Sequence, residues 1–429
     1  RINPTEDATS VKVTTSIISK SDEKKGDIVT QEIPAALFGF YEPRAEVGSG
    51  TAQFDLDLPA DAINKQTKVT LSLAPSVITA LQPSMQYLVH YPYGCVEQLT
   101  SSTAPTLIAN KYPNLFPDLH EGKELDTYIK EGIKKISESH YAYTGWGWWS
   151  HAPVSTFVTS YVLETLVEAE AQGYTKETKE AIVDATNYLS RPQNEKGEAL
   201  SNSERAIVRY GLSLVGKASS FPRPDDMSIL EDDLLAMAVI ANYRSGDKNP
   251  ESNGLNLLIL KAQKEGNTAH WQAAPSARFG SIDASTAWAV RAILTAGGDR
   301  ELAVAGANYL LNSRDNNYWS NTYGTVVTAR ALIDLYENDS EKNPNYAYSV
   351  KLDGQEIKSG SITSATTAIS DINIPVTKAD HKIEITKNGE GQLYSTLVSN
   401  LYRTDTNAKA SSNGLTLSRK YTNARNPDY

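Results

Sequence analysis

The period of the hydrophobic residues changes twice along this chain of 429 residues, and that change constrains the fold more than any other feature. In the first stretch apolar residues recur at every second position, from about Pro83 they recur at helical spacing, and after about Asn345 the period of two returns. A period of two is typical of β-strands, and recurrence at the third and fourth positions is typical of helices. The sequence therefore predicts β structure, then helices, then β structure.

The strand period is clear on both sides of the helical region. Before it, the alternating residues are Val11, Val13, Thr15 and Ile17, then Phe54, Leu56 and Leu58, then Val69, Leu71 and Leu73. After it, they are Tyr348, Val350 and Leu352, then Ile372 and Ile374, Ile383 and Ile385, and Leu393 to Val398. Asp353-Gly354 between two such runs predicts a hairpin turn.

The lengths of the three regions favour one architecture. Each β-rich region is too short to form a comfortable sandwich alone, so we expect one β-domain that the helical region interrupts. Roughly 260 residues of paired helices with short polar connections suit a ring of antiparallel helices better than a compact four-helix bundle. The expected fold class is therefore a multidomain α and β protein with a helical ring inserted into a β-sandwich.

Charge and cysteine usage exclude several function classes. The chain has 41 Lys and Arg against 51 Asp and Glu, a net charge of -10, so it carries no global basic field for nucleic acid or an anionic membrane. A single cysteine excludes an internal disulfide framework. We find neither an apolar signal segment nor an apolar run of membrane length, and we expect a mature or excised piece of a longer protein, with no direct membrane insertion.

The one cysteine, Cys95, stands three positions before Gln98 in the run YPYGCVEQ. Residues at i and i+3 face each other on a helical turn, so the Cys95 thiolate could attack the side-chain carbonyl of Gln98. The products are ammonia and an internal thioester. Gly94 suits a tight turn into the helix, and free amides at a helix start would favour the thiolate.

The neighbours of Cys95 each have two interpretations. Glu97 could polarise the site or assist proton transfer, or it could be a solvated carboxylate of the first turn. Tyr91 and Tyr93 could keep water and small amines from the thioester, or they could simply pack. The bland alternative for Cys95 itself is a small buried hydrophobic residue.

The run YPYGCVEQLTSSTAP resembles the thioester motif of the alpha-2-macroglobulin and complement superfamily, and particularly that of its bacterial members. Val96 stands where vertebrate members usually have glycine, a change also found in the bacterial branch. The resemblance implies an α/α toroid, the thioester domain, inserted into a CUB-type β-sandwich. The boundaries that we expect are 1–84, with room for a preceding linker, and 346–410 for the two parts of the CUB-type domain, 85–345 for the thioester domain, and 411–429 for the start of a truncated macroglobulin or receptor-binding-like domain.

By the same resemblance, the parent protein would be a bacterial broad-spectrum protease inhibitor. Its Cys95–Gln98 thioester would capture an attacking protease through lysine amines after bait cleavage, as a single-turnover trap rather than an enzyme, and without a cofactor. Its partners would be proteases and the missing macroglobulin domains. Its location would be periplasmic or at the cell surface, with a lipid anchor in the full-length protein. The stretch Arg191 to Arg205 lacks the histidine of hydroxyl-preferring relatives, which implies direct attack by amines.

Other functions remain open at this point. An α/α-toroid glycan-processing enzyme would use Trp148 and Trp149 with a carboxylate pair such as Asp232 and Asp233, although adjacent aspartates on a helix point apart. An inert structural module would never form the thioester. A cysteine-protease dyad would need Cys95 beside His90, His151 or His270. The scattered histidines lack metal-ligand spacing, so we expect no metal site, and we expect the tryptophans at 146, 148 and 149 mainly to pack.

Overall fold

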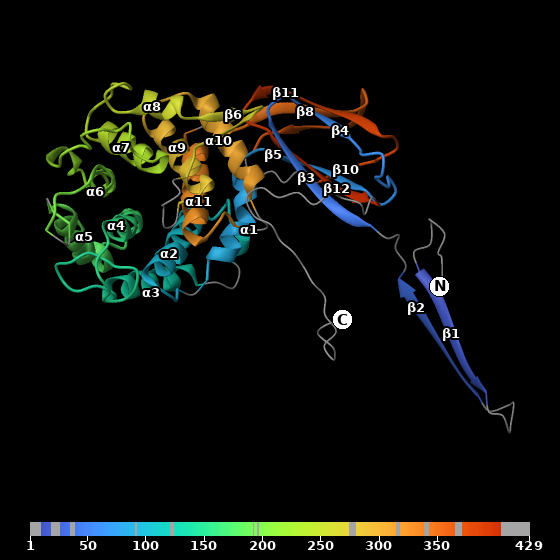
Figure 1. Cartoon of the computed structure of the whole chain (residues 1–429), viewed down its shortest axis with the longest axis horizontal. Helices are drawn as coiled ribbons and strands as arrows, with labels where there is room; N and C mark the ends of the chain where they lie inside the picture. The colour runs from blue at the N-terminus through green and yellow to red at the C-terminus, as the bar shows by residue number, and fades with distance from the viewer. Residues whose placement is uncertain are drawn as a thin grey trace, which may run out of the picture.

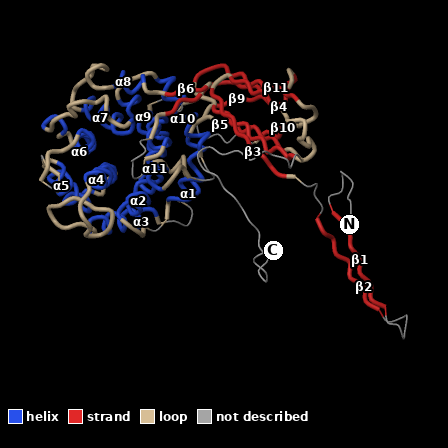
Figure 2. Tube along the Cα trace, viewed as in Figure 1, coloured by secondary structure: helices blue, strands red, loops and turns tan. Residues whose placement is uncertain are grey.

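The computed structural model describes residues 10–18, 26–34, 39–90, 92–120, 124–191, 193–194, 197–273, 280–314, 318–338, 343–364 and 371–404. Helices occupy the middle of the chain and antiparallel strands lie on both sides of it (Figures 1 and 2). The predicted mixture of α and β structure in the order β, α, β is therefore confirmed.

The strands run from 3 to 11 residues and the helices from 6 to 16. The strands are β1 (Ser10–Ile18), β2 (Gly26–Pro34), β3 (Phe40–Ser49), β4 (Ala52–Asp57), β5 (Lys68–Ala74), β6 (Gln263–Glu265), β7 (Thr268–His270), β8 (Asn345–Leu352), β9 (Gln355–Ile362), β10 (Ile372–Ile374), β11 (Asp380–Glu390) and β12 (Tyr394–Arg403). The helices are α1 (Ile78–Leu88), α2 (Val96–Lys111), α3 (Leu125–Glu138), α4 (Thr156–Ala171), α5 (Thr175–Leu189), α6 (Asn202–Leu214), α7 (Asp232–Arg244), α8 (Leu255–Leu260), α9 (Ile282–Thr295), α10 (Arg300–Ser313) and α11 (Thr322–Glu337), with 3₁₀ turns at Pro117–Leu119 and Ala218–Ser220.

Two four-stranded antiparallel sheets combine strands from before and after the helices. Their strand orders are β10-β5-β12-β3 and β4-β11-β8-β9. Both sheets contribute to one hydrophobic core, which includes Phe54, Leu71, Val350 and Leu397. Alternate residues of β4, β5, β8 and β11 point into that core because side chains of a strand alternate between its faces. The helical region thus interrupts a single two-layer β structure.

The first two strands do not join this structure. β1 and β2 pair with each other, with Val13 opposite Gln31, and they form a separate hairpin that lies away from the sheets (Figure 1). Ile17 and Ile28 are 71% and 68% exposed. The predicted strand at Val11 to Ile17 exists, but it pairs only with β2 and joins neither four-stranded sheet. It lies at the start of residues 1–84, where the expected boundaries leave room for a linker before the β-domain.

The change from strand to helix comes earlier than predicted. Helix α1 begins at Ile78, upstream of the expected boundary at residue 85, and it contains Pro83 within its length. Val77, Ile78 and Leu81 are buried in the helical core, so burial holds this helix in place despite the proline. The predicted hairpin turn at Asp353-Gly354 is confirmed, since both residues have positive φ and join β8 to β9.

Six of the helices, which we call the inner helices, close into a ring. α2 contacts α4, α4 contacts α6, α6 contacts α7, α7 contacts α9, α9 contacts α11, and α11 returns to α2. Helices α3, α5, α8 and α10 pack on the outside of this ring, as Figure 1 shows. Most residues of α4, α7, α9 and α11 are buried, as expected for helices with neighbours on every side.

A tryptophan connects three of the outer helices to the inner helix that follows. The indole N–H groups of Trp146, Trp271 and Trp319 donate to Ile136 O, Leu258 O and Leu310 O at 2.7, 2.7 and 2.5 Å. Their backbone N–H groups donate to the hydroxyls of Thr159, Thr286 and Thr325 at 2.8, 3.2 and 3.0 Å. All three tryptophans are fully buried. This repeated connector supports the predicted ring of paired helices and the predicted packing role of Trp146.

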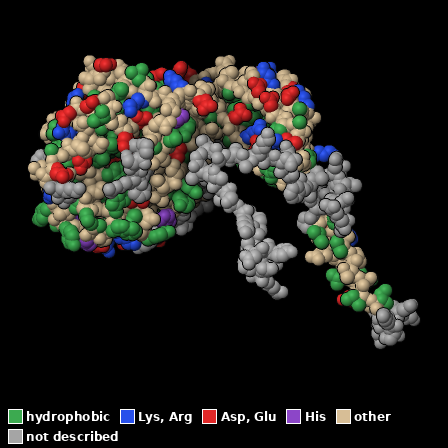
Figure 3. Space-filling model, in the orientation of Figure 1, with side chains coloured by type: hydrophobic (Ala, Val, Ile, Leu, Met, Phe, Trp, Pro, Cys, Tyr) green, Lys and Arg blue, Asp and Glu red, His purple; other side chains and the backbone are tan. Residues whose placement is uncertain are grey.

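The ring rests on the β structure through α10 and the β6–β7 hairpin. Asn267 Nδ2 donates to Val47 O at 2.5 Å, and Asn308 Nδ2 lies 3.4 Å from Ser49 Oγ. On the face drawn in Figure 3, Lys and Arg side chains are interspersed with Asp and Glu side chains. None of the described helices is both long and apolar enough to cross a bilayer.

Candidate functional site

Cys95 lies at the start of the first inner helix. It is the N-cap residue of α2, with extended backbone (φ -73°, ψ 173°), and the helix proper begins at Val96. Its side chain is half-buried. Cys95 therefore stands just before the first turn, beside the backbone N–H groups that have no partner within the helix.

The structure brings Cys95 and Gln98 together. Gln98 is residue N3 of α2, and its Oε1 accepts a hydrogen bond from the Cys95 backbone N–H at 3.1 Å. With the cysteine side chain placed over the N–H of Gln98, the two residues form a capping box. The side-chain carbonyl of Gln98 is thus folded back over Cys95, within one turn at the start of α2.

Gly94 makes room for this arrangement. Its φ of +107° is a conformation that glycine adopts without steric cost. A Cβ atom at this position would overlap Gln98 Oε1 and would lie 3.0 Å from Gln98 Cδ. The folded-back carboxamide therefore requires glycine at position 94.

Glu97 is buried, with only 4% of its surface exposed, so its interpretation as a solvated first-turn carboxylate is wrong. Its Oε1 accepts hydrogen bonds from Ser101 Oγ at 2.6 Å and from Thr322 Oγ1 at 2.8 Å. Ser101 Oγ also lies 2.8 Å from Tyr161 Oη. Glu97 is buried because it points from α2 toward α11 and α4 rather than toward solvent.

Two tyrosines, Tyr91 and Tyr93, come shortly before Cys95 in the chain. Tyr93 is 65% exposed, and its ring packs against that of His90 with centroids 4.9 Å apart. Tyr91 lies outside the described residues. Pro92, directly before Tyr93, is held by Lys135, whose Nζ donates to Pro92 O at 2.8 Å.

The aromatic run after α3 supports the start of α2 through its backbone. The Val96 N–H donates to Trp148 O at 3.1 Å, and the Trp148 ring stacks on Phe157 with centroids 5.9 Å apart. Trp149 is 65% exposed. The contact of Trp148 with the site was missed by sequence reasoning, since a backbone carbonyl leaves no residue-type signal.

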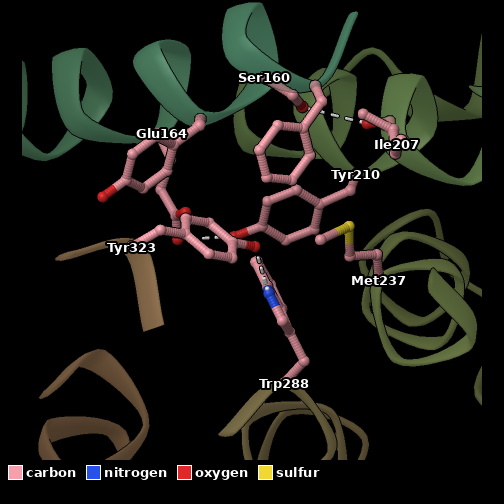
Figure 4. Close-up of a pocket in the computed structure, with 9 residues that line it drawn as sticks. Ser160, Glu164, Ile207, Tyr210, Met237, Trp288 and Tyr323 are labelled. Carbon is pink, nitrogen blue, oxygen red and sulfur yellow. Dashed lines mark hydrogen bonds between the residues drawn. The ribbon is translucent and has the colours of Figure 1, made fainter. Parts of the chain in front are cut away.

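A small pocket lies inside the ring, lined by residues of α4, α6, α7, α9 and α11 (Figure 4). Aromatic rings of Tyr161, Tyr210, Trp288 and Tyr323 dominate its wall, and Glu164 is its buried acid. Tyr210 Oη donates to Glu164 Oε1 at 2.6 Å, one of the hydrogen bonds drawn there.

Two arginines compensate the charge of Glu164. Arg291 Nη2 and Arg330 Nη1 donate to its two oxygens at 2.8 and 3.0 Å, and Arg330 also binds Glu168 with two hydrogen bonds. Burial alone would raise the pKa of Glu164, but these guanidinium groups lower it to about 2. Sequence reasoning missed this network, whose only signal was the presence of charged residues within otherwise apolar helices.

The residues of the glycan-enzyme alternative are not arranged as an acid/base pair. Asp232 is bound by Lys261 Nζ at 2.8 Å and by the Gln272 N–H at 2.9 Å. Burial raises the pKa of the neighbouring Asp233 to about 6, and its Oδ1 accepts from the Leu234 N–H at 2.9 Å. Trp148 and Trp149, the proposed sugar platform, do not line the pocket inside the ring, and they do not line a second pocket that contains Lys111 and Glu337.

The histidines of the dyad alternative have aromatic neighbours. His90 packs against Tyr93, whereas the rings of His151 and Tyr141 are 4.5 Å apart, centroid to centroid. His270 stacks on Tyr309 at 4.9 Å. Over the described ranges, no cluster of three or more His, Cys, Asp and Glu side chains could hold a metal ion.

Comparison with known proteins gives a consistent result. The profile of the family described as the A-macroglobulin TED domain matches residues 67–212. The chain is 23% identical over 359 residues to an alpha-2-macroglobulin of Thermotoga maritima, an alignment that covers 82% of this chain and 21% of that protein. It is 28% identical over 203 residues to an alpha-2-macroglobulin homolog of Yersinia pestis, covering 44% of this chain and 10% of that protein.

Solved structures share the fold. The structure of native Escherichia coli alpha-2-macroglobulin from domain MG7 to the C-terminus matches with a TM-score of 0.53 and 15% identity, over 90% of this chain and 61% of that one. Salmonella alpha-2-macroglobulin reacted with methylamine matches with a TM-score of 0.52 and 17% identity, over 94% of this chain and 26% of that one. The matched region thus spans only about a fifth or less of the two curated relatives.

Proposed function

This chain belongs to the superfamily of alpha-2-macroglobulin and complement thioester proteins, and from that premise we propose that Cys95 and Gln98 form an internal thioester that covalently captures proteases. The observation that carries the proposal is the folded-back Gln98 carboxamide, whose Oε1 accepts a hydrogen bond from the Cys95 N–H at 3.1 Å. Gly94 leaves the space that this carboxamide occupies. A reactive acyl group and a sulfur leaving group would then be stored in one turn of α2.

The thioester bond would form by acyl transfer from the Gln98 amide nitrogen to the Cys95 sulfur. The Cys95 sulfur attacks Gln98 Cδ, the Cδ–Nε2 bond breaks, and the thiol proton leaves with the amide nitrogen as ammonia. Holding both groups in one capping box lowers the entropic cost of this step. Glu97, fixed beside them by Ser101 and Thr322, would support the geometry of the turn.

Consumption of the thioester follows the same logic. A lysine amine of the attacking protease forms an amide with Gln98 Cδ, the C–S bond breaks, and the Cys95 thiol regains a proton. The acyl group is spent once, so the chain acts as a single-turnover trap rather than as an enzyme. The absence of histidine from the Arg191 to Arg205 stretch favours direct aminolysis over transfer to hydroxyls.

The architecture that we propose assigns a role to each region. The helical region from α1 to α11, for which residues 85–345 are expected, would be an α/α-toroid thioester domain. It would be inserted into a CUB-type sandwich formed by β3 to β5 and β8 to β12, within the expected 1–84 and 346–410, and the β1–β2 hairpin would precede that sandwich. The sheets with mixed strands and the closed ring of inner helices support this assignment. Residues 411–429, assigned to a further macroglobulin or receptor-binding-like domain, lie outside the described part of the chain.

The wider context is also a proposal. Bait cleavage and broad-spectrum inhibition would belong to the longer parent protein, with its macroglobulin domains as intramolecular partners. The curated relatives reported above are bacterial, which supports a periplasmic or cell-surface role in bacterial defence, with a lipid anchor elsewhere in the parent.

Intact-mass spectrometry tests the thioester directly. We expect freshly purified protein to be lighter than its sequence by one ammonia, and methylamine to add its own mass while freeing Cys95 for a thiol reagent. Gln98→Ala is the matched control, since it retains the thiol but cannot acylate it. A wild-type mass equal to the sequence, with Cys95 already free, would refute the proposal.

A further inference from the structure

The candidate site lies at the place where the helical ring closes. We call the contact between α2, the first inner helix, and α11, the last inner helix, the seam. The chain leaves the β structure after β5, just before α1 and α2, and it returns to β8 after α11. The seam is therefore the junction between the two ends of the inserted helical region.

One end of the seam is joined by Glu97 and Thr322. The hydroxyl of Thr322 donates to Glu97 Oε1 at 2.8 Å, and Ser101 of the same helix as Glu97 donates to that oxygen at 2.6 Å. Glu97 lies between Cys95 and Gln98 in sequence and is 4% exposed. A buried carboxylate depends on its donors, so the position of Thr322 restrains the turn that carries both reacting groups.

Thr322 is itself firmly placed. It is the first residue of α11, directly after the N-cap Asn321, whose side chain accepts from the Gly324 N–H at 2.8 Å. The next residue, Tyr323, is 2% exposed, and its hydroxyl accepts from the Trp288 indole N–H at 2.9 Å. The donor to Glu97 therefore comes from a fixed point of the ring and not from a mobile surface side chain.

The other end of the seam has a comparable polar connection far from Cys95. Lys111 Nζ donates to Glu337 Oε1 at 2.9 Å, and Tyr112 Oη binds the same oxygen. α2 has 16 residues, so this end lies roughly 24 Å along the helix from Cys95. The chain thus provides two connections across one helix pair, of which one adjoins the candidate site.

We propose that Thr322 is a positioning residue for thioester formation, acting through Glu97 to hold the first turn of α2 in the geometry that brings Gln98 Cδ to the Cys95 sulfur. The proposal rests on the thioester function proposed above. It adds a residue that neither the motif nor the comparisons single out, from the last inner helix of the ring.

The experiment compares Thr322→Val with Glu337→Gln. Thr322→Val keeps the shape of the side chain and removes its donor, and Glu337→Gln weakens the connection at the far end of the seam. Intact mass gives the ratio of molecules that have formed the thioester to molecules that retain unreacted Cys95 and Gln98. Molecules with a hydrolysed thioester, which carry a carboxylate at position 98, count as having formed it.

We expect Thr322→Val to lower this ratio about tenfold, since the loss of a hydrogen bond to a buried charge and a small misplacement of reacting groups each have effects of that order. Thr322→Ser should restore the ratio, and Glu337→Gln should leave it unchanged. Circular dichroism and the melting temperature verify that each variant is folded.

Two results would overturn the positioning role alone. These are a Thr322→Val ratio equal to that of the wild type, or an equal loss in Glu337→Gln, which would mean that general weakening of the seam is responsible. If the wild-type protein shows no loss of ammonia, the thioester function fails and the role of Thr322 falls with it, so the two failures are distinguishable.

Discussion

Replacing Gly94 with alanine should separate the geometry of the turn from the stability of the fold. The backbone φ of +107° costs a residue with a Cβ on the order of 1–2 kcal/mol. The new Cβ would also overlap Gln98 Oε1 and lie 3.0 Å from Cδ, so the carboxamide must swing away. Losing its hydrogen bond to the Cys95 N–H adds about 1 kcal/mol, for a total near 2–3 kcal/mol.

The effect on chemistry should be larger than the effect on stability. A displacement of about 1 Å between reacting atoms can reduce a rate by ~10²-fold, so we expect Gly94→Ala to form little thioester. Urea unfolding measures the free energy of unfolding of the variant, and intact mass measures the fraction of molecules lighter by one ammonia. Both readings come from the same preparation.

Gly173→Ala is the matched control for this prediction. Gly173 has a φ of +99°, yet an added Cβ there meets no atom within 4 Å. It should therefore show the backbone cost of about 1–2 kcal/mol and retain its full thioester content. If Gly94→Ala kept the wild-type thioester fraction, the argument that the folded-back carboxamide requires glycine would be wrong.

Three further predictions concern the ring. Glu164→Gln should lower the free energy of unfolding by about 3–5 kcal/mol in urea titrations, because Arg291 and Arg330 lose the carboxylate that both of them bind. A loss below ~1 kcal/mol would contradict this reasoning. Thr325→Val should lower the free energy of unfolding by about 1–3 kcal/mol, since the buried backbone N–H of Trp319 loses its acceptor. An unchanged free energy of unfolding would count against the role of this tryptophan connector. Burial raises the pKa of Asp233 to about 6, above its ordinary 3.8, so its contribution to stability is present below pH 3.8 and lost as the pH rises through 6. Asp233→Asn should therefore raise the melting temperature relative to wild type more at about pH 8 than at about pH 5, and an equal difference at both would refute the assignment.

Much of the fold could be predicted because buried residues are mostly apolar and recur with the period of the strand or helix that carries them. Phe54 and Leu56 alternate with polar residues in β4, and Val158, Val162 and Leu166 recur along α4, as their burial requires. The hairpin β1–β2 shows the limit of that periodicity, since alternation predicts a strand but does not identify the sheet that it joins. The start of α1 was missed for a related reason, because Val77 and Ile78 extend an apolar stretch whose period alone does not separate strand from helix.

The candidate site was predictable only where its contacts are local. Cys95, Gly94 and Gln98 lie within five consecutive positions, so the spacing of a helical turn was enough to place the carbonyl of Gln98 at Cys95. Glu97 has one partner four residues away, Ser101, and another 225 residues away, Thr322. No local pattern in the sequence indicates the second contact, because it exists only when the ring closes and α11 comes to lie beside α2. The sequence therefore leaves the solvated and the site-facing interpretations of Glu97 open, and the contact with Thr322 in the folded ring decides between them.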